Sequence, residues 1–138
     1  MANDLYEEMG LTRIVSTDPT GKACLEYAAR PQQCHSGGVV QGGFVSGWID
    51  AAMAHAVIAK VGQDVVPMTL ELKVSFLGPA RPGPVFAEGW IIKSGRSTAF
   101  VEGRLTDGAG NLLATASSTL MLADRGRVEA AAKAATAT

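Results

Sequence analysis

The sequence has few charged residues and no charge cluster of one sign. Asp, Glu, Lys and Arg make up 18% of the 138 residues, and the formal net charge is −1. No basic patch is visible, so we expect no nucleic-acid partner. A charge content this low in a small domain favours a homo-oligomer, because part of the apolar surface must then be covered by another copy of the chain.

The sequence also lacks the patterns of a metal site or a secretion signal. Cys24 and Cys34 have neither C-x-x-C spacing nor flanking histidines, so we expect two free thiols, no metal and no cofactor. The first residues, 1–8, are acidic and contain no apolar signal-peptide segment. We therefore expect a cytoplasmic protein.

The longest apolar stretch runs over residues 39–59, where only Asp50 and His55 can carry charge. A membrane span is not predicted, because a central Asp would cost roughly 2.5–3.5 kcal/mol and the segment also holds Gln and several Gly. The pattern instead predicts a helix from residue 41 or 42 to about residue 60, ended by Gly62. A helix that is apolar on nearly every side is expected to be buried all round.

Asp50 is the residue whose presence in this apolar helix most requires an explanation. A buried carboxylate is rare unless it is paired or caps a helix locally. Gly43, Gly47 and Ala54 fall on the same side of the helix as Asp50, so either another helix or a thin ligand chain packs there. Gly42 and Gly43 lie where helix N–H donors are free. Donors at a helix start and a carboxylate further along it are compatible with an acyl-transfer site.

The rest of the chain predicts strands. Residues 11–16 and 22–29 form an opening hairpin, and residues 69–76 alternate Leu70, Leu72, Val74 and Phe76 with polar residues. Further strands are predicted at 85–93, 98–106 and 112–122, giving a four-stranded antiparallel meander. The fold class is therefore α+β, as one domain over residues 1–123. Residues 124–138 are Ala-rich and form either a frayed helix or a disordered tail.

The stretch Gly38-Val39-Val40-Gln41-Gly42-Gly43-Phe44, followed by Asp50-Ala51-Ala52, resembles a motif of the hotdog-fold acyl-CoA thioesterases. The branch is that of phenylacetate-pathway and 4-hydroxybenzoyl-CoA thioesterases. Residues 68–77, with Pro79 and Gly83, are similar to the family's strand after the helix. The resemblance covers residues 5–123. It implies one long helix wrapped by a curved antiparallel sheet, an acyl-CoA substrate, and a dimer or homotetramer with active sites at the subunit interface.

The resemblance also implies roles for individual residues. Asp50 matches the helix carboxylate that acts as nucleophile or as general base on water. Gly42 matches the glycine whose N–H polarises the thioester carbonyl, and Thr69 matches a Ser or Thr near the reaction centre. The turn of Lys93, Ser94, Gly95 and Arg96 lies where the family contacts coenzyme A, and Arg81 is a weaker candidate for a phosphate.

Two positions depart from the family pattern. Gln41 stands where the family often has His, and it can hold the loop or donate a hydrogen bond but cannot act as acid or base. His35 stands where Asn is frequent. Its imidazole could donate to an oxyanion, titrate as a partner, or lie in solvent.

Other readings of the sequence stay open. His55, Trp48 and Phe44 lie around the helix from Asp50 and are interpreted as core or interface residues. A non-catalytic acyl-CoA-binding protein of the same fold would not need Asp50. A hotdog dehydratase or hydratase would need a His beside Asp50, and His55 is poorly placed for that. A structural domain would use the small residues only to pack helices.

Overall fold

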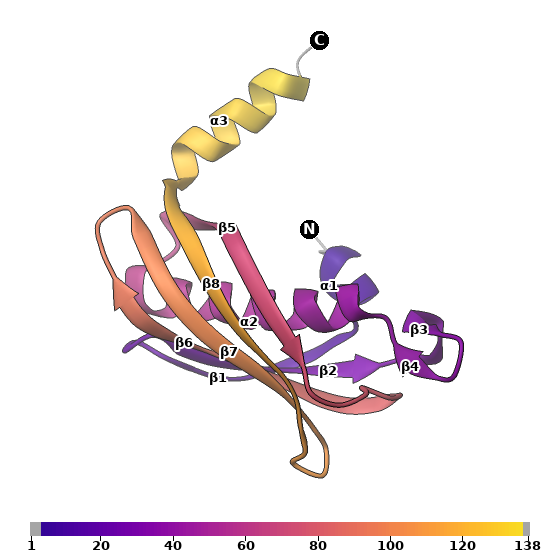
Figure 1. Cartoon of the computed structure of the whole chain (residues 1–138). Coiled ribbons are helices and arrows are strands. Elements are labelled where there is room, and N and C mark those ends of the chain that lie inside the picture. Colours follow the sequence, from indigo (N-terminus) through magenta and orange to yellow (C-terminus); the bar gives the residue numbers. More distant parts are fainter. Residues whose placement is uncertain (1–3, 137–138) are drawn as a thin grey trace.

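The computed structural model describes residues 4–136. The long helix α2 (Gly42–Val61) lies against one face of a six-stranded antiparallel sheet (Figure 1). This arrangement confirms the predicted α+β hotdog fold. The strands of the sheet are β1 (Leu11–Asp18), β2 (Lys22–Ala29), β5 (Val65–Phe76), β6 (Gly83–Ser94), β7 (Thr98–Asp107) and β8 (Leu112–Asp124). Smaller elements are α1 (Asp4–Met9), η1 (Pro31–Gln33), β3 (Cys34–His35), β4 (Val39–Val40) and α3 (Arg125–Thr136).

The strand order is β1-β2-β6-β7-β8-β5, so the predicted four-stranded meander is wrong. β6, β7 and β8 do form a meander, but β5 pairs with β8 at the edge, and β6 pairs with β2. The linker 77–82 contains Pro79 and Pro82, which have no N–H to donate to a ladder. Its backbone bonds elsewhere: Leu77 N donates to Leu113 O, and Ala80 O accepts from Val40 N. The linker therefore crosses to the middle of the sheet.

Helix α2 buries only the side that faces the sheet. Trp48 is fully buried and stacks on Tyr27, with ring centroids 5.7 Å apart. The side that carries Asp50 is open, so the expectation of a helix buried all round is wrong for a single chain. The physical reason is that one sheet wraps only part of a helix. The buried residues of α2 are Val45, Trp48, Ile49, Ala52, Met53, Ala56 and Val57.

The helix approaches the sheet closely over a row of small residues. Ala23, Gly89, Gly103 and Ala116 are direct cross-strand partners along β2, β6, β7 and β8. A Cβ atom at Gly89 would lie 2.7 Å from the Cα atom of Met53 in α2. The small size of the residues in this row therefore sets the distance between helix and sheet.

Helices α2 and α3 differ in their contact with the sheet. By length and composition alone α2 could cross a membrane, yet it is the core helix on which the sheet packs. Helix α3 occupies the Ala-rich tail, extends away from the sheet in Figure 1, and has no buried residue.

Candidate active site

Asp50 and Thr69 meet on the open side of α2. The Thr69 hydroxyl, from β5, donates a hydrogen bond of 2.8 Å to Oδ1 of Asp50. The carboxylate keeps its second oxygen for other partners, and the side chain is partly exposed. Asp50 is therefore a carboxylate that Thr69 orients and that a ligand can reach.

A bulge in β5 makes this pair possible. The ladder pairs Thr69 with Leu120 and Glu71 with Thr119, so Leu70 has no partner and is 63% exposed. Regular alternation would place Thr69 on the opposite face of the sheet from Leu72, and that prediction is wrong. The extra residue turns Thr69 towards the helix, on the same face as Leu72.

The start of α2 leaves one donor free. Gln41 is the N-cap, and its Oε1 atom accepts a hydrogen bond of 2.8 Å from the Gly43 N–H. As the first residue of the helix, Gly42 has no acceptor for its N–H within the helix. Gln41 thus provides an acceptor for the Gly43 N–H. The Gly42 N–H, at the positive end of the helix dipole, stays available to a ligand.

A groove of about 390 Å³ lies beside this donor. The ring of Phe76 forms one wall, and its Cζ atom is 3.2 Å from the position that a Cβ on Gly42 would occupy. His35 lies at the groove and is exposed, with Nδ1 2.8 Å from Ser36 O. The other lining residues are Val39, Val40, Val45, Leu77, Gly78, Pro79 and Ala80.

The two glycines beside Asp50 differ in their surroundings. The side chain of Met9 in α1 covers Gly47, where a Cβ would lie 2.6 Å from the Met9 Cε atom. Gly43 is exposed, and a Cβ there would lie 2.7 Å from Gln41 Oε1, the atom that caps the helix by accepting from the Gly43 N–H. Of the two explanations for this stripe, packing of another helix therefore holds for Gly47, which α1 covers, and not for Gly43.

His55 is a packed residue, as interpreted from the sequence. Its Nδ1 atom lies 2.9 Å from Ala51 O, one turn earlier in α2, and its ring centroid is 6.2 Å from that of Tyr6. No group of three or more His, Cys, Asp or Glu side chains suited to a metal ion occurs within residues 4–136.

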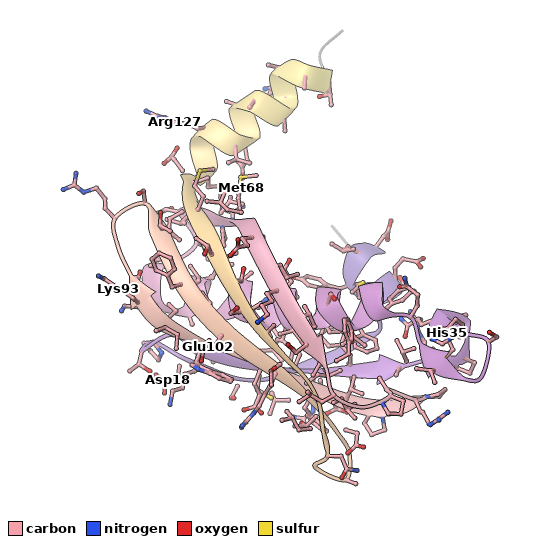
Figure 2. All side chains as sticks on the ribbon, viewed as in Figure 1. Asp18, His35, Met68, Lys93, Glu102 and Arg127 are labelled. Carbon is pink, nitrogen blue, oxygen red and sulfur yellow. The ribbon has the colours of Figure 1, made fainter. Side chains whose placement is uncertain are left out.

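The turn expected to contact coenzyme A lies away from the helix start. Lys93 and His35 are at opposite ends of the molecule in Figure 2. Ser94 pairs with Ala99, Ala99 with Leu120, and Leu120 with Thr69, so the turn is three strands, about 14 Å, from Thr69. Arg81 is nearer to the helix start, and its Nη1 atom donates to Gly37 O at 3.2 Å. One chain thus does not bring Lys93, Ser94, Gly95 and Arg96 to Gly42.

Comparison with known proteins identifies the family. Residues 37–114, which include α2 and the Asp50–Thr69 pair, match the model of the thioesterase superfamily. A provisionally named esterase of Saccharolobus solfataricus is 32% identical over 96 residues, 70% of this chain and 68% of the relative.

The solved structures similar to this chain include two proteins that each have a TM-score of 0.80. One is a phenylacetic acid degradation-related protein of Ralstonia eutropha, a provisionally named thioesterase, with 30% identity over 88% of this chain and 91% of that protein. The other is a conserved protein of Pseudomonas aeruginosa, with 26% identity and coverage of 88% and 95%. The resemblance to hotdog thioesterases is confirmed: the chain belongs to the thioesterase superfamily and is a thioester hydrolase.

Proposed function

We propose that the protein hydrolyses an acyl-CoA thioester to a free acid and coenzyme A, with Asp50 at the reaction centre. The hydrogen bond from Thr69 to Asp50 carries this proposal, because it orients one carboxylate oxygen and leaves the other free on an open face. No cofactor is required, since coenzyme A is part of the substrate.

The chemistry needs one donor for the carbonyl oxygen and one oxygen nucleophile. The Gly42 N–H donates a hydrogen bond to the carbonyl oxygen, on which negative charge develops, as in an oxyanion hole. Asp50 then either attacks the carbonyl carbon or removes a proton from water that attacks it. If Asp50 attacks, the C–S bond breaks, the thiolate leaves and an acyl–Asp50 anhydride forms, which water then hydrolyses to the free acid and the Asp50 carboxylate. If Asp50 removes a proton from water, the water oxygen bonds to the carbonyl carbon, the C–S bond breaks, and the thiolate takes up the proton that Asp50 received. Gln41 holds the helix start, and His35 can add a second donor.

The site is shared by two copies of the chain in this proposal. Gly42 and Asp50 are eight residues apart in one helix, about 12 Å along its axis. A carbonyl bound at about 3 Å by the Gly42 N–H would lie too far from Asp50 of the same chain for attack at about 3.5 Å. Antiparallel helices from two copies can bring Gly42 of one chain to Asp50 of the other.

The edge strand supports such an assembly. β5 is the last strand of its sheet, and four apolar residues in or next to it are well exposed. An apolar, unpaired edge favours pairing with a second copy. We therefore propose a dimer, or a dimer of dimers, located in the cytoplasm, with neither nucleic acid nor membrane as partner. The four residues are Met68 (42%), Leu70 (63%), Phe76 (56%) and Leu77 (59%).

Thiol release from short-chain, long-chain and aromatic acyl-CoAs tests the proposal, with wild type and Asp50→Asn in parallel. We expect hydrolysis by the wild type and a loss of about 10²–10⁴-fold in the variant, with the fold unchanged by circular dichroism. Binding of acyl-CoA without thiol release would instead indicate a non-catalytic binder. Equal activity in both proteins would exclude Asp50 and direct attention to His35.

A further inference from the structure

We propose that the groove beside the start of α2 binds the acyl group of the substrate, and that Phe76 determines which acyl groups fit. This inference rests on the proposed function and names a substrate-selecting residue for the same site.

Phe76 is held directly next to the proposed donor. Its Cζ and Cε1 atoms lie 3.2 and 3.4 Å from the position of a Cβ on Gly42, the residue whose N–H is free. The backbone of Phe76 is fixed by its pairing with Ala114, while its side chain is 56% exposed. A carbonyl that accepts a hydrogen bond from Gly42 must therefore lie close to this ring.

The groove suits an apolar group. Val40, Val45 and Ala80 are at most 4% exposed and form its buried part. Of its lining side chains, His35 alone is polar, and it is exposed. A charged group placed here would lose its hydration without a partner, whereas an aliphatic or aromatic group would gain from burial.

The distribution of charge gives the substrate a direction. An acyl-CoA has an apolar end and a strongly anionic end. Lys93, an exposed cation of the predicted coenzyme A turn, lies at the opposite end of the molecule from His35 at the groove (Figure 2), whereas Arg81 directly follows the groove residue Ala80 and donates to Gly37 O. Because the groove lining is apolar, the acyl group enters it and the anionic thiol arm stays outside it, where its charges remain hydrated.

Acyl selectivity and thiol-arm binding are separated with two sets of substrates. Acetyl, hexanoyl and benzoyl groups are offered both as CoA thioesters and as N-acetylcysteamine thioesters, which lack most of the thiol arm. Wild type, Phe76→Ala and Phe76→Leu are compared by their hexanoyl-to-acetyl and benzoyl-to-acetyl ratios of kcat/KM. The control is Phe100→Ala, because Phe100 is 47% exposed but alternates with the buried residues Ala99 and Val101 and so lies on the other face of the sheet.

We expect Phe76→Ala to change at least one ratio by about 10-fold or more, equally in both substrate sets. Phe76→Leu should change it less, and Phe100→Ala should not change it. The oligomeric state of each variant is measured by light scattering. If Phe76→Ala changes the oligomeric state, the acyl selectivity ratios of kcat/KM of Phe76→Leu are used to judge the inference.

Unchanged ratios in an active enzyme would overturn the inference and leave the proposed function standing. A loss confined to the CoA thioesters, with unchanged acyl ratios, would also overturn it and assign the groove to the thiol arm. No hydrolysis of any thioester by the wild type would overturn the proposed function, and this inference with it.

Discussion

The Thr69 hydroxyl donates to the Asp50 carboxylate over 2.8 Å and so joins the edge strand β5 to the core helix α2. The bond spans two elements that each lie on the open side of the chain, and it depends on the bulge at Leu70.

Thr69→Val removes the hydroxyl and keeps the shape of the side chain. Because a hydrogen bond to a charged group contributes about 1.5–3 kcal/mol, we expect kcat to fall at least about 10-fold. Thr69→Ser, which keeps the hydroxyl, should retain activity; equal losses in Val and Ser variants would contradict a role for this bond.

The Gly42 N–H can be removed without disturbing the helix. Gly42→Pro deletes the donor at the first helical position, where Pro is tolerated, and Gln41 already has the extended backbone that Pro requires before it. We expect kcat/KM to fall by about 10²–10³-fold, the usual effect of losing one oxyanion donor. Gly42→Ala is the control, because it keeps the N–H and adds a methyl group against Phe76. If Gly42→Pro has the same kcat/KM as Gly42→Ala, the Gly42 N–H is excluded as an oxyanion donor.

A shared site predicts complementation between two inactive variants. Asp50→Asn and Gly42→Pro chains are unfolded and refolded together in equal amounts. Half of the dimers should then be mixed, each with one intact site, so about one quarter of wild-type activity should return. Each variant refolded alone is the control. A mixture no more active than its parents would mean that Gly42 and Asp50 of one chain act together.

The close contact between helix and sheet predicts a steric effect at Gly89. A Cβ there would lie 2.7–2.8 Å from backbone atoms of Ala52 and Met53, which cannot move aside like a side chain. We expect Gly89→Ala to lower the free energy of unfolding by about 1–3 kcal/mol in urea titrations. Gly78→Ala is the control, because its nearest neighbour is the Leu113 Cδ2 atom at 3.8 Å. Equal stability of the two variants would contradict the packing argument.

The β7–β8 turn is expected to loosen in acid. Hydrogen bonds from the Asn111 side chain and from the backbone N–H groups of Asn111, Ala109 and Gly110 hold the pKa of Asp107 below its usual value. A lowered pKa in the folded state means that the stabilisation is complete above the ordinary Asp pKa, about 3.9, and is lost as the pH falls through the lowered value. The amide resonances of Ala109 and Asn111 should therefore shift together in that acidic range.

Asp107→Asn removes the titrating group from this turn. The acid-dependent shift of the Ala109 and Asn111 amides should be absent in that variant, because no carboxylate is left to protonate. If the shift persists in Asp107→Asn, another group causes it.

Local patterns predicted the central helix and its charged residue. The apolar stretch ends at Gly62, where the structure caps α2 through the Ile58 carbonyl, and Gln41 precedes its start. Asp50 stands out because it is an acid in an apolar helix. These features depend on residues close together in the chain, so sequence spacing is enough to find them.

Long-range pairing was not predictable in the same way. The partner of β5 is β8 rather than its neighbour in sequence, and the bulge at Leu70 breaks an alternation that looked regular. Thr69 was therefore found by resemblance and not by periodicity. One missed signal was present: Gly89 and Gly103 are glycines inside two predicted strands, and they are direct partners in the β6–β7 pair, where the helix approaches.

The position of β5 also has a consequence for synthesis of the chain. Its ladder joins residues as far apart as Val65 and Asp124, so β5 leaves the ribosome well before its partner strand exists. During that interval both of its edges and its apolar side chains lack partners, and closing so long a loop is slow. The charged side chains of Glu71 and Lys73, in the middle of the strand, then oppose premature association with other nascent chains.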